Sequence, residues 1–87
     1  MILQFTASFK RDYQRLPEQI QKQTEKALKL LTANPRHPSL QVKRIQGTRD
    51  IWEARVTLGY RFTFNWAGNV VTLRRLGTHD ILKEETR

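Results

Sequence analysis

Residues 51–82 read IWEARVTLGYRFTFNWAGNVVTLRRLGTHDIL, and apolar side chains occupy every second position through the first half of this stretch. Such alternation is the pattern of a strand that turns one face to the core and the other to solvent. It predicts two strands, at 51–58 and 61–66. Their apolar rows are Trp52, Ala54, Val56, Leu58 and Phe62, Phe64, Trp66.

Two turn signals connect these strands and add a third. For both apolar rows to face one core, the first hairpin needs an odd loop, which residues 58–60 supply. Gly68-Asn69 is a two-residue hairpin signal, and it predicts a further strand that begins near residue 70. This even loop places Arg74 on the polar face and turns Arg75 inward unless a bulge releases it. The sequence leaves open which of the two arginines faces a ligand.

The sequence before residue 51 predicts one more strand and two helices. Residues 2–5 have the pattern of a short strand, and Ser8 is the expected N-cap of a helix over about 9–16. A second helix is expected from Pro17 to the break at Asn34-Pro35. The predicted fold class is α+β: an N-terminal strand and an α-helical hairpin packed on a small antiparallel β-sheet. Residues 1–87 are expected to form a single domain.

The chain is strongly basic. It carries 16 Lys and Arg against 8 Asp and Glu, a formal net charge of +8, and its pI is about 10.7. This excess in a short globular chain favours a polyanionic partner, with nucleic acid first, and is also compatible with an acidic protein.

The composition excludes several other kinds of site. The chain contains no cysteine, so it has neither disulfides nor thiolate metal ligands and suits a reducing, cytoplasmic compartment. No apolar run approaches the length of a membrane span. No zinc spacing or phosphate-binding glycine loop is present, and His79, Asp80 and Glu84-Glu85 are the only local candidates for metal ligands, so we expect no metal and no cofactor.

The polar faces of the predicted strands suggest chemistry on phosphate. Arginine offers a planar fork of donors that fits phosphate oxygens, and it stays charged at any relevant pH. Arg55 and Arg61 lie on these faces, and His79 follows the last strand. Because histidine exchanges a proton near neutrality, this combination favours RNA cleavage without a metal.

With these elements in this order, the chain resembles the RelE/ParE superfamily of bacterial toxin–antitoxin toxins. The likeness covers the N-terminal strand and helix pair, the Asn34-Pro35 break, IWEARV at 51–56, GYRF at 59–62 and LGTH at 76–79. It implies the RelE-like microbial RNase fold. It also implies an mRNA interferase in the RelE-like branch, or a gyrase poison in the ParE-like branch.

Residue by residue, the resemblance favours the RNase branch. It implies that Arg61 lies near the scissile phosphate, with Arg55 at the position of a strand lysine. Arg75 matches an active-site arginine of YafQ-like members, and His79 matches a C-terminal histidine that acts as general base or acid. Glu53 stands where RelE-like members have another lysine. The C-terminal tyrosine of some members is missing, since the tail 80–87 contains none.

Further residues are expected to bind RNA. Lys43 and Arg44 are assigned to the RNA backbone, and Arg74 is the alternative to Arg75. Tyr60 is expected either to stack on a base or to serve as a structural aromatic. Glu53 is expected either to form a structural ion pair with an arginine or to act as a second base.

The resemblance implies two partners. One is mRNA on the ribosome, which is expected to be cleaved at the ribosomal A site. The other is a cognate antitoxin, bound in a toxin–antitoxin hetero-oligomer. Two alternatives stay open. One is a non-catalytic, ParE-like toxin that binds gyrase. The other is a degenerate domain that only binds RNA or an antitoxin.

Overall fold

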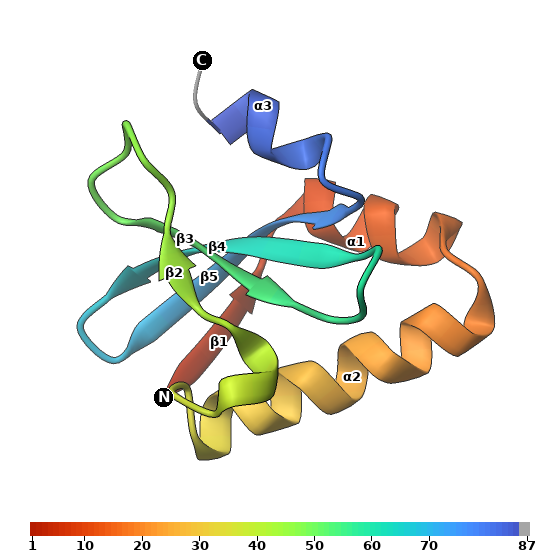
Figure 1. Ribbon diagram of the computed structural model, residues 1–87, viewed down its shortest axis with the longest axis horizontal. Coiled ribbons are helices and arrows are strands. Elements are labelled where there is room, and N and C mark those ends of the chain that lie inside the picture. Colours follow the sequence, from red (N-terminus) through yellow and green to blue (C-terminus); the bar gives the residue numbers. More distant parts are fainter. Residues whose placement is uncertain (86–87) are drawn as a thin grey trace.

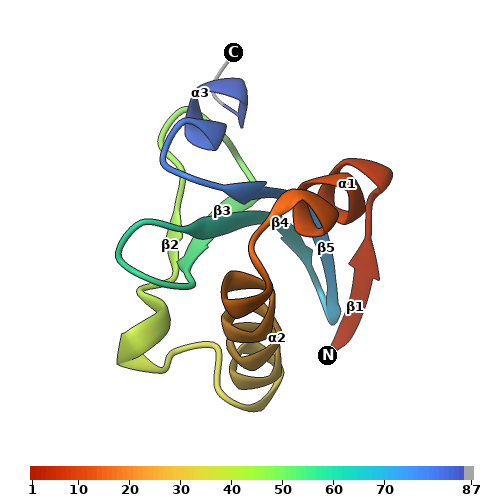
Figure 2. The same cartoon turned by 90° about the vertical axis from the view of Figure 1, so that its right-hand side faces the viewer.

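The computed structural model describes residues 1–85 and has the predicted α+β architecture (Figure 1). A five-stranded sheet forms the middle layer, with α2 on one face and α3 on the other (Figure 2). The elements in chain order are β1 (Ile2–Phe5), α1 (Ala7–Arg15), α2 (Glu18–Ala33), the 3₁₀ turn η1 (Pro38–Leu40), β2 (Lys43–Arg44), β3 (Ile51–Arg55), β4 (Arg61–Ala67), β5 (Val70–Gly77) and α3 (Ile81–Glu85).

The strands are ordered β1-β5-β4-β3-β2 across the sheet. Strands β2 to β5 are antiparallel neighbours, which confirms the predicted antiparallel sheet. Strand β1 adds a parallel edge, with Ile2 opposite Val70 and Phe5 opposite Leu73. The sequence predicts β1 as a strand but not its partner, because a four-residue strand specifies its register only weakly.

The core lies between the sheet and α2. Phe62 and Phe64 of β4 are fully buried there, and Phe9 of α1 meets Phe62 edge-on at 6.4 Å between ring centroids. Burying a side chain of this size stabilises the fold by about 1.5–3 kcal/mol. The largest fully buried apolar side chains are Phe62, Phe64, Leu31, Leu40, Leu73 and Val71.

The first helix begins earlier than predicted. Thr6, not Ser8, is the N-cap: its Oγ1 accepts a hydrogen bond from Phe9 N at 3.1 Å. The same hydroxyl donates to Leu73 O at 2.9 Å, so the cap also ties α1 to β5. This tertiary bond selects Thr6 over Ser8. No helix within residues 1–85 is long and apolar enough to cross a membrane.

The hairpin between β3 and β4 is longer than predicted. Strand β3 ends at Arg55 rather than residue 58, and the loop 56–60 has five residues, still an odd number. The backbone N–H groups of Val56 and Thr57 both donate to Tyr60 O, at 2.9 and 3.1 Å, which closes the loop early. Leu58, predicted to face the core, is 86% exposed at its tip.

The second hairpin contains the bulge that releases Arg75. Gly68-Asn69 makes the predicted two-residue turn, with Gly68 at φ +59°. Further along, Thr63 lies opposite Arg75 while the next residue of β4 lies opposite Leu73, so Arg74 is the extra residue. Thr63 Oγ1 accepts from Arg75 N at 3.2 Å and stabilises this irregularity. The bulge therefore places Arg75 on the polar face of the sheet.

Candidate nucleic-acid interface

The strand registers place Lys43, Arg61 and Arg75 on the face opposite α2, together with Arg55, which at the end of β3 also lines a hollow beside α2. Partners in register share a face of a sheet, so each cross-strand row can be followed over several strands. One row passes over four strands and the next over three. The rows are Lys43, Glu53, Thr63, Arg75 and Arg55, Arg61, Gly77.

Arg61 is held in place by Glu53. Its Nη1 donates to Glu53 Oε1 at 2.8 Å, and the two side chains are only 17% and 8% exposed. Arg61 Nε is buried and has no hydrogen-bond partner among the described residues. A buried charge requires a partner, and Glu53 provides one. The structure therefore contains the ion pair that was one of the two expected roles of Glu53.

Arg55 lies directly opposite Arg61 across the two strands. Like charges in this position destabilise a sheet unless an opposite charge offsets them. Glu53 offsets Arg61, whereas half-buried Arg55 makes no ion pair with any described residue. An anion bound between the two guanidinium groups would remove this repulsion.

Arg75 is tethered on two sides. Its Nε donates to Asp12 Oδ2 of α1 at 2.8 Å, and its guanidinium also forms an ion pair with Glu84 of α3. The hydrogen bond that Arg75 donates to Asp12 raises the pKa of Arg75 above its ordinary value. Burial opposes this shift, and the charges of Asp12 and Glu85 add to it. Asp12 also accepts from Leu76 N at 3.0 Å, so one carboxylate fixes both the strand end and the guanidinium.

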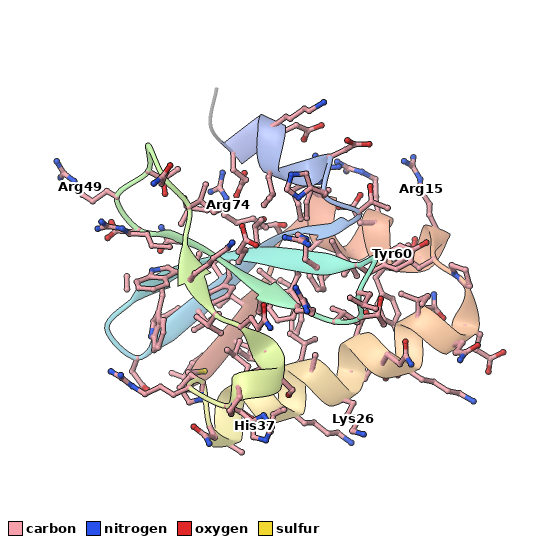
Figure 3. All side chains as sticks on the ribbon, in the orientation of Figure 1. Arg15, Lys26, His37, Arg49, Tyr60 and Arg74 are labelled. Atoms are coloured by element: carbon pink, nitrogen blue, oxygen red, sulfur yellow. The ribbon has the colours of Figure 1, made fainter. Side chains whose placement is uncertain are left out.

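Arg74 points to α3 instead (Figure 3). Its Nε and Nη2 donate to the two carboxylate oxygens of Glu85 at 2.7 and 3.2 Å, and the Glu85 side chain is 4% exposed. The sequence leaves open which of the two arginines faces a ligand. In the structure Arg75 lies in the polar rows, and Arg74 anchors α3. Both arginines bond to carboxylates of the C-terminal helix.

A hollow of about 450 Å³ lies between the edge strand and α3. Lys43 and Arg44 line it from β2, Glu53 from β3 and Leu82 from α3, and both basic side chains are exposed. Of the two predicted backbone-binding residues, Lys43 therefore lies beside the Arg61–Glu53 pair as the register partner of Glu53, whereas Arg44 is the register partner of Trp52.

His79 and Tyr60 lie at the ends of the strands. His79 is exposed in the turn from β5 to α3, two residues after Gly77, the register partner of Arg61. Its backbone carbonyl accepts from Leu82 N at 3.1 Å, and its ring makes no hydrogen bond with a described residue. Tyr60 is half-buried in the β3–β4 loop (Figure 3).

Among the carboxylates that bond the arginines, only Glu53 is predicted from the sequence to pair with one. Asp12 is 63 residues from Arg75, and the tail carboxylates Glu84 and Glu85 are not predicted to bond an arginine. No local pattern connects such distant groups; only the strand order brings them together. Within residues 1–85 no three His, Asp or Glu side chains form a group able to hold a metal ion.

Solved structures with this architecture include toxins of toxin–antitoxin pairs. The model superposes on a YoeB/ParE toxin from Agrobacterium tumefaciens with a TM-score of 0.76, at 20% identity over 91% of this chain and 99% of that one. It matches RelE in the RelB-RelE antitoxin-toxin complex from Methanococcus jannaschii with a TM-score of 0.76, at 19% identity over 97% and 99% of the two chains.

The E. coli DinJ-YafQ toxin-antitoxin complex also contains a similar chain, with a TM-score of 0.78 and 15% identity over 92% of this chain and 93% of that one. No family model and no curated protein sequence matches this chain. At these identities the comparisons establish a shared fold, that of the RelE, YoeB/ParE and YafQ toxins.

Proposed function

We propose that the chain is the toxin of a toxin–antitoxin pair and a metal-independent endoribonuclease that cleaves mRNA at the ribosomal A site in the cytoplasm. The observation that carries the proposal is the facing pair Arg55 and Arg61 on a basic sheet face of a RelE-like fold. Guanidinium groups on two cross-strand partners can approach one phosphate from two sides, and each offers a planar fork of donors that fits its oxygens. Without a bound anion, the repulsion between Arg55 and Arg61 only destabilises the sheet.

The chemistry follows from the groups at hand. A base removes the proton of the ribose 2′-hydroxyl, whose oxygen attacks the adjacent phosphorus. The bond from phosphorus to the 5′-oxygen breaks, and an acid protonates the leaving oxygen. Arg61 and Arg55 stabilise the phosphate charge, Arg75 supports them, and His79 supplies or removes a proton. Positioned proton transfer contributes about 10²–10⁴-fold in rate, and one preorganised donor about 10²–10³-fold.

The proposed protein partner is an antitoxin segment that covers this basic face. RelE and YafQ were crystallised with the antitoxins RelB and DinJ. In the present chain, acidic residues of such a segment would bond the same arginines that Glu84 and Glu85 now bond. Lys43, Arg44 and Tyr60 are proposed to contact the RNA on the ribosome.

The test is primer extension on cellular mRNAs after brief induction of the chain. New, codon-phased 5′ ends are expected for the wild type and for Arg15→Ala, a control in an exposed residue of α1 (Figure 3). They are expected to vanish in His79→Ala and Arg61→Lys. The lysine keeps a positive charge for Glu53 but loses the planar fork. Unchanged cleavage in both variants would refute the nuclease mechanism.

A non-catalytic toxin is the second candidate, and the Arg61–Glu53 pair favours it, because a paired arginine meets a phosphate less readily. Growth arrest without new RNA ends would support this candidate and direct the search to a protein target such as gyrase. Neither arrest nor cleavage, with folded protein present, would support a domain that only binds RNA or an antitoxin.

A further inference from the structure

A second hollow, of about 340 Å³, lies on the other side of the edge strand. Trp52 of β3 and Trp66 of β4 line it from the core face of the sheet, and their rings meet edge-on at 5.7 Å between centroids. Both are half-buried, so part of each indole faces the hollow rather than the core. They are the two tryptophans of the whole chain.

The rim of this hollow is basic. Arg36 is exposed there and His37 is half-buried, while none of the described residues that line the hollow is acidic. His37 Nδ1 contacts Ser39 N at 3.2 Å and Ser39 Oγ at 2.8 Å, so the ring is held in place at the rim. The hollow thus combines aromatic surface with the guanidinium of Arg36 and an imidazole ring.

The backbone at the rim is strained. Gln41 has φ +46° and ψ +47°, and it is the one non-glycine residue within the described chain with positive φ. Side chains other than glycine adopt this left-handed conformation at a cost, and such outliers concentrate at binding sites. The hollow is also continuous in sequence with the basic face, because Gln41 and Val42 line it while Lys43 and Arg44 line the hollow beside α3.

We propose that the tryptophan hollow binds an unpaired base of single-stranded RNA, which passes from the basic face around the edge strand β2. This inference rests on the proposed function for its ligand class. Aromatic side chains stack on bases of any sequence, and neighbouring cations hold the phosphates. A helical RNA has its bases stacked and paired and presents none for insertion. The surplus of positive charge on the rim and in the whole chain favours RNA over an uncharged peptide.

Intrinsic fluorescence tests this site directly, because both tryptophans of the chain lie in it. The probe is a pyrimidine 2′-O-methyl RNA octamer, which lacks the 2′-hydroxyl and cannot be cleaved. Saturable quenching of the emission is expected with the single strand, and little or none with the same strand in a duplex. Arg36→Ala is expected to weaken the binding by about tenfold, whereas Arg15→Ala, which removes an equal charge elsewhere, leaves it within about twofold.

Three results would overturn the proposal: no quenching by the single strand, equal quenching by the duplex, or equal loss of affinity in Arg36→Ala and Arg15→Ala. Quenching by a purified antitoxin but not by RNA would also overturn it and identify the hollow as a protein-binding site. The primer-extension assay separates the two hypotheses. Cleavage by wild type without quenching removes only the base site, and quenching without cleavage removes only the nuclease mechanism.

Discussion

The Arg61–Glu53 pair makes a quantitative prediction about stability. Arg61 Nη1 and Glu53 Oε1 are 2.8 Å apart, and the side chains are 17% and 8% exposed. At an effective dielectric constant of about 20, two unit charges about 4 Å apart attract by about 4 kcal/mol. Removing one partner of a buried pair costs about 3–5 kcal/mol. Because solvent reaches part of Arg61, we expect the lower end, about 3 kcal/mol, for Arg61→Ala.

Most of this cost comes from the carboxylate that stays behind. Adding Glu53→Gln to Arg61→Ala replaces a buried, unpaired charge by a neutral amide of the same size. We expect the second substitution to recover about 2 kcal/mol. In a domain of this length 1 kcal/mol shifts Tm by about 4–8 °C, so the double variant is expected to melt about 8–16 °C above Arg61→Ala.

The assay is urea unfolding and thermal melting of the wild type, both single variants and the double variant, which together form a double-mutant cycle. The exposed pair of Lys22 and Glu18, 3.5 Å apart on α2, provides the matched control. Its cycle is expected to give no more than about 0.5 kcal/mol. If the double variant melts at or below Arg61→Ala, the ion pair does not stabilise the sheet and the reasoning fails.

Three further predictions concern the tail, the end of the η1 turn and α1. Glu84→Gln with Glu85→Gln releases Arg74 and, within residues 1–85, leaves Arg75 paired with Asp12 alone. RNA binding is expected to tighten, and its salt dependence to steepen by about one phosphate contact; filter binding at several salt concentrations checks this. Gln41→Gly relieves a left-handed backbone and is expected to raise Tm by about 2–8 °C in a thermal melt. Burial, then the charge and hydrogen bond of Glu25, raise the pKa of Tyr13 above 10.0. The stability that this neutral phenol contributes is present below pH 10.0 and is lost as pH rises through its folded-state pKa, and absorbance at 295 nm is expected to show Glu25→Gln lowering that pKa.

The sequence predicts the sheet well because strand alternation is a local signal. The faces of β3 and β4, the turn at Gly68-Asn69 and the end of α2 at Asn34 all agree with the structure. Its errors occur where a tertiary or loop hydrogen bond outweighs a local pattern. Leu58 continues the alternation of β3, but the hydrogen bonds to Tyr60 O end the strand before it.

The sequence predicts only part of the candidate site, for the same reason. Strand parity alone places Arg55 and Arg61 on one polar face, and the register then sets them opposite each other. The position of Arg75 depends on a bulge that the sequence permits but does not require. Its ion pairs depend on helices at both ends of the chain, and a pattern read along one segment contains no information about such distances.

The acidic residues of this basic chain give the site its organisation. Of the 8 Asp and Glu, four bond to arginines on or beside the polar rows: Asp12, Glu53, Glu84 and Glu85. Two of the four are set in the body of the fold, on α1 and β3. The other two belong to α3, a helix of five residues that follows an exposed turn.

This difference separates two roles for the carboxylates. Asp12 and Glu53 belong to α1 and β3 and bond their arginines at 2.8 Å, so they orient the guanidinium forks before a ligand arrives. Preorganised groups of this kind reduce the ordering cost of binding. Glu84 and Glu85 can leave with a short helix, and an RNA phosphate offers the same arginines an equivalent anionic partner. Binding of a polyanion to this face is therefore an exchange of anions at Arg74 and Arg75, whereas at Arg61 it adds an anion to an existing pair.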